Sequence, residues 1–186
     1  MILFFWVLCD SIVEQYADLD NLAPPVLGVY KYWLSLPKCA ELPLKSCLDP
    51  VDIPTKLLPY VFLVQLETNP FAALIRLQGT YINHSLGEYF TDKYIDQSTF
   101  GNSATAIWAG YEEAAQKRVA YVSHEEVYGL SGQTMLIEAI HLPMVDEEEG
   151  HVNYFLGALS RISGVTNHDH EFRGRRWDVK AISNIA

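Results

Sequence analysis

Cysteine is scarce in this sequence, and the few that occur form no recognisable metal or disulfide pattern. Cys9, Cys39 and Cys47 are an odd number, have no CxxC spacing and have no His-x-His pair close to them. A zinc site needs four converging ligands at recognisable intervals, so we expect none. The motif His168-Asp-His170 likewise lacks converging partners. This cysteine usage is typical of a reduced intracellular protein, and we therefore expect a cytoplasmic location.

Catalytic signature motifs are also absent. The sequence has no GxSxG, no HExxH and no glycine-rich phosphate loop of the GxGxxG or P-loop type, which argues against the enzyme classes that depend on them. His124 and Glu126 share one face of an expected strand, whereas Glu125 points to the other face. The pair is either a base with an orienting carboxylate or a solvent-facing polar pair. We expect no enzymatic activity.

Basic residues are too few to balance the acidic ones. Lys and Arg total 13 against 23 for Asp and Glu, which gives a formal net charge of −10. An acidic surface repels phosphate backbones and anionic lipid headgroups, so we expect neither nucleic-acid nor membrane binding. The cluster of Arg173, Arg175 and Arg176 with Trp177 is therefore either a solvated tail or a protein-docking patch.

A long apolar run is missing too. The apolar start, MILFFWVLC, ends at Cys9, short of the about 20 residues that a membrane-spanning helix needs. A signal peptide begins with positive charge, and the first basic residue here is Lys31. Helical spacing of apolar residues predicts instead a helix within residues 1–24, which contacts a second subunit or, alternatively, packs on its own domain. The expected homodimer contacts are Phe5, Leu8, Ile12, Tyr16 and Leu19.

The rest of the chain shows clear helix and strand periodicity. Pro24-Pro25 opens an expected helix over about 25–36, and apolar residues with helical spacing predict a second helix over 102–119. Alternating, β-branched and aromatic segments predict strands at about 60–66, 72–78, 120–128, 133–144 and 151–161. We therefore expect one α+β domain over residues 25–162, followed by a polar tail over 163–186.

This order of elements resembles a PAS domain, the five-stranded antiparallel sensor fold with helices on one face. The resemblance covers about residues 28–162 and is closest to a small bacterial branch of stand-alone PAS proteins. The segments that carry it are Tyr32-Trp33-Leu34, DPVDIP at 49–54, LLPYVFLV at 57–64, IRLQGT at 75–80, Leu142-Pro143-Met144 and the strand end at Gly157. The resemblance implies signal or ligand sensing, usually as a dimer, with a small-molecule pocket between the sheet and the helices.

Aromatic side chains are plentiful enough to build such a pocket. The sequence contains 11 tyrosines and 4 tryptophans, whose rings can hold a small organic molecule while donating a hydrogen bond. The alternative is that these side chains fill the interior completely. The residues that we expect to line the pocket are Ile75, Tyr81, His84, Trp108, Tyr111, Met135, Ile137 and Tyr154.

Two cofactors used by PAS domains are disfavoured. A flavin-cysteinyl adduct needs a cysteine in the middle of the fold, but all three cysteines precede the first expected strand of the hairpin. A haem-binding PAS domain usually places its axial histidine on the long helix, and residues 102–119 contain none. His84, His124 and His141 remain geometrically possible ligands, although we do not expect haem. The identity of any cofactor stays open.

The expected function is that of a non-enzymatic sensor that binds a small molecule or a partner protein. About 25 residues lie on either side of the domain, so we expect a separate effector chain. Two alternatives stay open. One is a small cone-shaped α+β enzyme of ketosteroid-isomerase type, although we identify no inward-facing carboxylate on the last three strands. The other is a ligand-free protein-protein adaptor.

Overall fold

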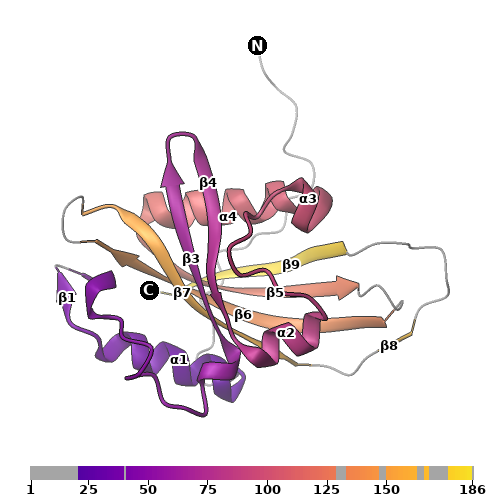
Figure 1. Cartoon of the computed structure of the whole chain (residues 1–186), viewed down its shortest axis with the longest axis horizontal. Coiled ribbons are helices and arrows are strands. Elements are labelled where there is room, and N and C mark those ends of the chain that lie inside the picture. The colour runs from indigo at the N-terminus through magenta and orange to yellow at the C-terminus, as the bar shows by residue number, and fades with distance from the viewer. Residues whose placement is uncertain are drawn as a thin grey trace.

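An antiparallel sheet forms the centre of the structure, a computed structural model that describes residues 21–39, 41–128, 133–146, 150–162, 166–167 and 176–185. The strand order is β4-β3-β7-β6-β5-β9, and the short β8 pairs with β6 (Figure 1). The strands are β3 (Val61–Thr68), β4 (Phe71–Gln78), β5 (Ala120–Tyr128), β6 (Gln133–Val145), β7 (Val152–Arg161), β8 (Thr166–Asn167) and β9 (Arg176–Ile185). Strands β3 to β7 are the five antiparallel strands predicted from the sequence, so the α+β fold class is confirmed.

Helices cover both faces of this sheet. Neighbouring residues of a strand point to opposite faces. On β6, Glu138 contacts the start of α1, whereas Ala139 lines a cavity shared with α2, α3 and α4. Helix α1 therefore lies on one face of the sheet and the other three lie on the opposite face (Figure 1). The helices are α1 (Pro24–Ser35), α2 (Thr80–Leu86), α3 (Gln97–Phe100) and α4 (Ala104–Lys117); a small pair, β1 (Lys38–Cys39) and β2 (Leu42–Pro43), follows α1.

Helix α1 is tied to β6 at both of its ends. Its buried stripe is Val26, Val29 and Trp33, spaced three and four residues apart as one helical face requires. At the start of the helix, the backbone N–H of Ala23 donates to Glu138 Oε1 at 2.7 Å. Near its end, Trp33 Nε1 donates to the carbonyl of Pro143 at 3.0 Å. The helix is therefore positioned by β6 and not only by apolar packing.

The segment between α2 and α4 folds back along the edge of β4. Helix α2 ends at Gly87, whose φ of 68° is the left-handed conformation of a helix C-cap. The backbone N–H of Asp92 donates to the carbonyl of Ile75 on β4 at 2.7 Å, and the N–H of Ile75 donates to the carbonyl of Lys93 at 3.0 Å. Asp96 caps α3 with its side chain. This segment thereby brings the aromatic residues before and within α3 over the sheet.

The C-terminal region differs from the predicted polar tail. Residues 176–185 form β9, which pairs antiparallel with β5 from Ala120↔Ile185 to Tyr128↔Arg176. Without β9, β5 would be an edge strand with unpaired backbone N–H and C=O groups. The pairing with β9 provides hydrogen-bond partners for these groups. A register shift between His124 and Glu125 marks a bulge in the pairing. The alternation of Trp177, Val179 and Ala181 with polar residues is the strand signal in this segment, which the prediction of a tail overlooked.

Some predictions concern residues that the structure does not describe. The helix expected within residues 1–24 lies outside the described residues up to Asp20, and so do all five predicted dimer contacts. Arg173 and Arg175 are outside them as well. Within the described part of the chain, no helix combines the length and the apolar character needed to cross a membrane.

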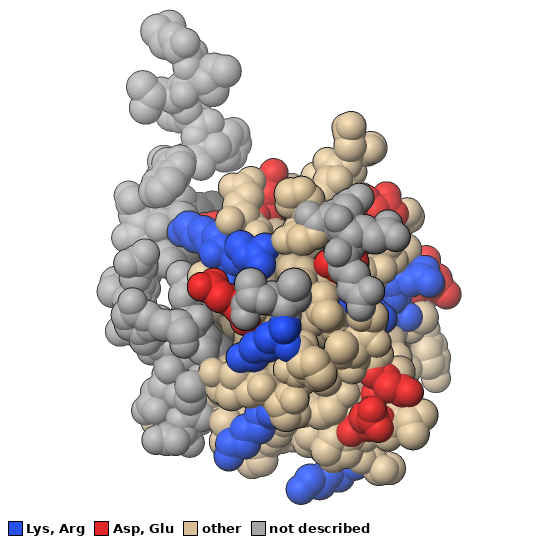
Figure 2. Space-filling view, turned by 90° about the vertical axis from the view of Figure 1, so that its left-hand side faces the viewer, with Lys and Arg blue, Asp and Glu red and all other residues tan. Residues whose placement is uncertain are grey.

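Charges on the described surface are mixed in sign. Figure 2 shows one face on which basic and acidic side chains are interspersed. The exposed pairs are Arg76 with Asp92 at 3.3 Å, Lys93 with Glu88 at 3.0 Å and Lys117 with Glu113 at 2.6 Å. Exposed pairs of this kind contribute at most about 1 kcal/mol each.

Candidate functional site

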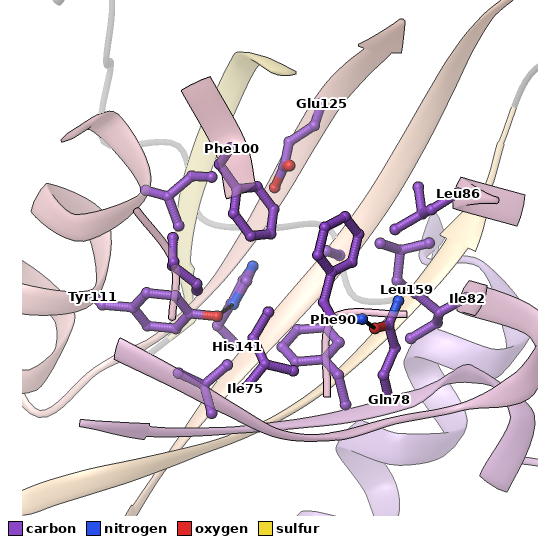
Figure 3. Close-up of a pocket in the computed structure, with 15 residues that line it drawn as sticks. Ile75, Gln78, Ile82, Leu86, Phe90, Phe100, Tyr111, Glu125, His141 and Leu159 are labelled. Carbon is purple, nitrogen blue, oxygen red and sulfur yellow. Dashed lines mark hydrogen bonds between the residues drawn. The ribbon is translucent and has the colours of Figure 1, made fainter. Parts of the chain in front are cut away.

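A cavity of about 80 Å³ lies between the sheet and the layer formed by α2, α3 and α4 (Figure 3). Every strand from β3 to β7 contributes to its wall, and most of its lining side chains are apolar. The lining residues are Phe62, Val64, Ile75, Gln78, Ile82, Leu86, Phe90, Ile95, Phe100, Ile107, Tyr111, Glu125, Ala139, His141 and Leu159. An apolar cavity with a few polar groups is typical of a small-molecule site.

The helical part of the wall comes from residues four positions apart. Ile82 and Leu86 reach the cavity from α2, and Ile107 and Tyr111 reach it from α4, because residues at this spacing share one helix face. The ring of Phe90 stacks on that of Phe100, with centroids 5.0 Å apart and planes at 29°.

Three polar residues of the wall, Tyr111, His141 and Glu125, are connected through Ser123 by hydrogen bonds, whereas Gln78 accepts from the backbone N–H of Phe90 at 2.7 Å. The hydroxyl of Tyr111 lies 3.0 Å from Nδ1 of His141, and Nε2 of the same ring lies 3.3 Å from Ser123 Oγ. Ser123 Oγ in turn donates to Glu125 Oε1. The ring of His141 also stacks on Tyr121, with centroids 4.2 Å apart and planes at 8°. The imidazole is thus held by contacts in its plane and on its face.

Burial determines the protonation states of the hydrogen-bonded side chains His141 and Glu125. Desolvation lowers the pKa of His141 from 6.5 to about 3, so the ring is neutral at physiological pH. Desolvation raises the pKa of Glu125, although the Ser123 hydrogen bond and nearby His124 act in the opposite direction. A neutral imidazole has one donor and one acceptor. With Tyr111 donating to Nδ1, Nε2 carries the proton and points it at Ser123, which donates to Glu125.

The structure brings two of the eight expected lining residues to this cavity, Ile75 and Tyr111. Met135 and Ile137 are buried on the same face of β6 as Ala139, but further along the strand. The half-buried Trp108 neighbours the lining residue Ile107 on α4.

The other three expected lining residues have different surroundings. The ring of Tyr81 packs on Tyr60 with centroids 4.3 Å apart. His84 is exposed. Tyr154 is half-buried, with Lys45 Nζ 5.4 Å from its ring centroid. None of the three lines this cavity.

Sequence reasoning missed the polar wall. It identified no inward-facing carboxylate on the last three strands, but Glu125 on β5 is buried and lines the cavity. The alternation of β5 carried the signal, because Tyr121, Ser123 and Glu125 are every second residue and share a face. The suggested pairing of His124 with Glu126 is also replaced: His124 Nε2 lies 3.0 Å from Glu138 Oε2 on the opposite face of the sheet.

The histidines considered as haem ligands have other surroundings. His84 is exposed on α2, His124 pairs with Glu138, and both ring nitrogens of His141 have hydrogen-bonding partners. Across the described ranges, no group of three His, Cys, Asp or Glu side chains is arranged to hold a metal ion.

The arrangement of the strands and a family model together give the family. In chain order, the five strands β3 to β7 lie in the sheet as second, first, fifth, fourth and third, around a cavity covered by the intervening helices. The family model described as PAS domain matches residues 23–160, about three quarters of the chain. The chain belongs to the PAS domain family. Searches of the curated proteins and of the solved structures found no significant match.

Membership of the PAS family gives the broad functional class. PAS domains are generally sensory rather than catalytic, and they commonly mediate partner interactions or dimerise. The ligand, the partner and the effector of this PAS domain are not given by the family, so they have to be argued from the site itself.

Proposed function

We propose that this PAS domain is a sensor that binds a small, largely apolar molecule in the cavity between its sheet and α2 to α4. The observation that carries the proposal is the cavity itself. Protein interiors are normally close-packed, yet a space of about 80 Å³ remains among side chains that are mostly buried. Apolar walls favour an apolar ligand, and the Tyr111–His141–Ser123–Glu125 chain supplies polar groups at one side of it.

The cavity also has a structural connection to the far side of the sheet. Glu125 lines the cavity, and the preceding residue of β5, His124, pairs on the opposite face with Glu138. Glu138 accepts the backbone hydrogen bond that holds the start of α1. Ligand binding that displaces β5 would therefore alter the contact between the sheet and α1. We propose that this change at α1 transmits the binding event to the partner protein.

The remaining parts of the proposal rest on the sequence. We propose a cytoplasmic homodimer formed through residues 1–24, which passes its signal to a separate effector protein. Removal of residues 1–20 is expected to weaken dimerisation in sedimentation equilibrium. An equally stable dimer after this deletion would contradict that part of the proposal and leave the ligand site unaffected.

A ligand screen by thermal unfolding tests the binding function. A compound that binds the folded state raises the melting temperature with its concentration. We expect at least one small apolar compound to stabilise the wild-type protein. The variant A139L places three additional carbon atoms in the cavity, and it should lose this response. A109L is the matched control, because Ala109 is an exposed residue of α4. An unchanged response in A139L would place the binding site outside this cavity, whereas no response to any compound would favour the ligand-free adaptor.

A further inference from the structure

We propose that the cavity selects a small ligand with an alkylammonium group, for which the carboxylate of Glu125 is the counter-ion. This inference rests on the proposed function and names the ligand class of the same cavity. It follows from three properties of the wall: its charge, its unused hydrogen-bond acceptors and its aromatic rings.

The only acidic side chain among the described lining residues is that of Glu125, and none of these residues is Lys or Arg. The one histidine of the wall, His141, engages both ring nitrogens with Tyr111 and Ser123 and is buried. The wall therefore offers no positive charge to an anionic ligand. A buried carboxylate without a counter-ion is unfavourable, and an ammonium group would supply that counter-ion.

The free hydrogen-bond acceptor positions of Glu125 also favour a ligand with an ammonium group. An ionised carboxylate accepts at about four positions, and in the described part of the chain Ser123 is its only hydrogen-bond donor. Because Tyr111, His141 and Ser123 donate in sequence toward Glu125, the chain ends in an acceptor. A ligand that donates N–H groups matches this end of the chain, whereas a ligand with only acceptor atoms does not.

Aromatic rings complete the recognition. Phe62, Phe90, Phe100 and Tyr111 all line the cavity. Figure 3 shows Glu125 and Phe100 among the residues that line the same cavity. Aromatic ring faces attract cations, and the attraction is strongest where water is excluded. A carboxylate together with several aromatic rings is the chemistry that recognises an alkylammonium group.

The cavity limits the size of the ligand. Its volume of about 80 Å³ is smaller than the roughly 150 Å³ of an engineered cavity that binds benzene. A short alkyl chain of about four carbons is therefore a suitable probe. The aliphatic part of the wall, which includes Val64, Ile75 and Ile107, would contact the alkyl chain.

Three probes with the same alkyl chain test the inference: n-butylamine, n-butanol and butyrate. Their dissociation constants are measured on the full chain at neutral pH by titration followed by NMR. The account predicts that the protonated amine binds at least about tenfold more tightly than the alcohol, and that butyrate binds more weakly than both. In E125Q the preference for the amine should disappear while butanol binding stays. In E126Q, which changes the net charge equally from the opposite face of β5, the preference should persist.

A second variant guards against a folding defect in E125Q. F100L removes one aromatic ring and should weaken amine binding more than butanol binding. Butanol or butyrate binding as tightly as the amine would overturn the ligand class while leaving the cavity a small-molecule site. Retention of the amine preference in E125Q would likewise overturn the ligand class, because Glu125 would then not be the counter-ion. Failure of all three probes to bind the wild-type protein would overturn this inference, whereas the proposed small-molecule function would be overturned by the thermal screen only if no compound stabilised the protein.

Discussion

The hydroxyl of Tyr111 on α4 lies 3.0 Å from Nδ1 of His141 on β6. This contact joins the helical layer to the middle of the sheet at the wall of the cavity. Both side chains are buried, and the next partners along the chain are Ser123 and Glu125 of β5. These four residues therefore form a polar network within an apolar interior, where each donor and acceptor depends on its neighbour.

Removing the Tyr111 hydroxyl should destabilise the fold. Y111F keeps the ring but leaves Nδ1 of His141 without its donor in a buried site, at a cost of about 1–2 kcal/mol. Urea unfolding monitored by circular dichroism measures this change. Y121F is the matched control, because the Tyr121 ring also contacts His141 but by stacking, and both ring nitrogens of His141 are engaged by other residues. Equal effects of the two substitutions would contradict the assigned role of Tyr111.

Stability should fall with acidity because of His141. Its pKa is about 3 in the folded protein against 6.5 as a reference, so the unfolded chain binds a proton in this range that the folded chain does not. The stabilisation is fully present above pH 6.5 and is lost as the pH falls toward 3, at up to about 1.4 kcal/mol per pH unit. H141Q should flatten the pH dependence, whereas the control H84Q, at an exposed site, should not. If the free energy of unfolding changed with pH equally in the wild type and in H141Q, His141 would not be the cause of the pH dependence.

Glu125 should show the opposite pH dependence. Burial raises its pKa above 4.5, so its contribution to stability is fully present below 4.5 and is lost as the pH rises through the raised value. In the absence of ligand, E125Q should therefore gain stability relative to the wild type as the pH rises from 4.5 to 8. Thermal melts of both proteins across this range measure the difference. A difference that shrinks with rising pH would contradict a desolvated carboxylate at this position.

Two glycines should respond to alanine with opposite signs. A Cβ on Gly157 would overlap the ring of Phe62 and lie 2.6 Å from the backbone carbonyl of Ile140, so G157A should lose about 1–3 kcal/mol. A Cβ on Gly110 of α4 would come no closer than 3.6 Å to the Tyr121 hydroxyl. G110A should therefore gain about 0.5–1 kcal/mol through helix propensity. Chemical denaturation of the pair checks both signs, and a stabilising G157A would contradict the observed packing.

The sequence predicted the strands β3 to β7 because each has alternating or β-branched residues and ends near turn residues. The helix over residues 102–119 was predicted from apolar residues with helical spacing, and the structure places α4 at Ala104–Lys117. Strand β9 was missed although Trp177, Val179 and Ala181 alternate with polar residues, which is a strand pattern. That pattern does not show that the strand pairs with the edge of β5. Local periodicity predicts a strand, but it does not predict which strand of the sheet that strand pairs with.

The cavity was harder to predict than the fold. On α2, Tyr81 and His84 were chosen for their chemistry, but the face that meets the sheet is given by the apolar pair Ile82 and Leu86. On β5, the polar residues Ser123 and Glu125 occupy the inward face, which alternation alone would have shown. Which stretch of β6 borders the cavity depends on how the helices cross the sheet, and no single-strand pattern contains that information.

Mass spectrometry of the freshly purified full chain tests the central claim most directly. Native and then denaturing spectra are compared for the wild type, A139L and A109L. The account predicts a defined additional mass on native wild-type and A109L protein, which is released on denaturation and is absent from A139L. An additional mass that persists equally in A139L, or native wild-type protein with no additional mass beyond its polypeptide chains, would contradict a small-molecule sensor with its site in this cavity.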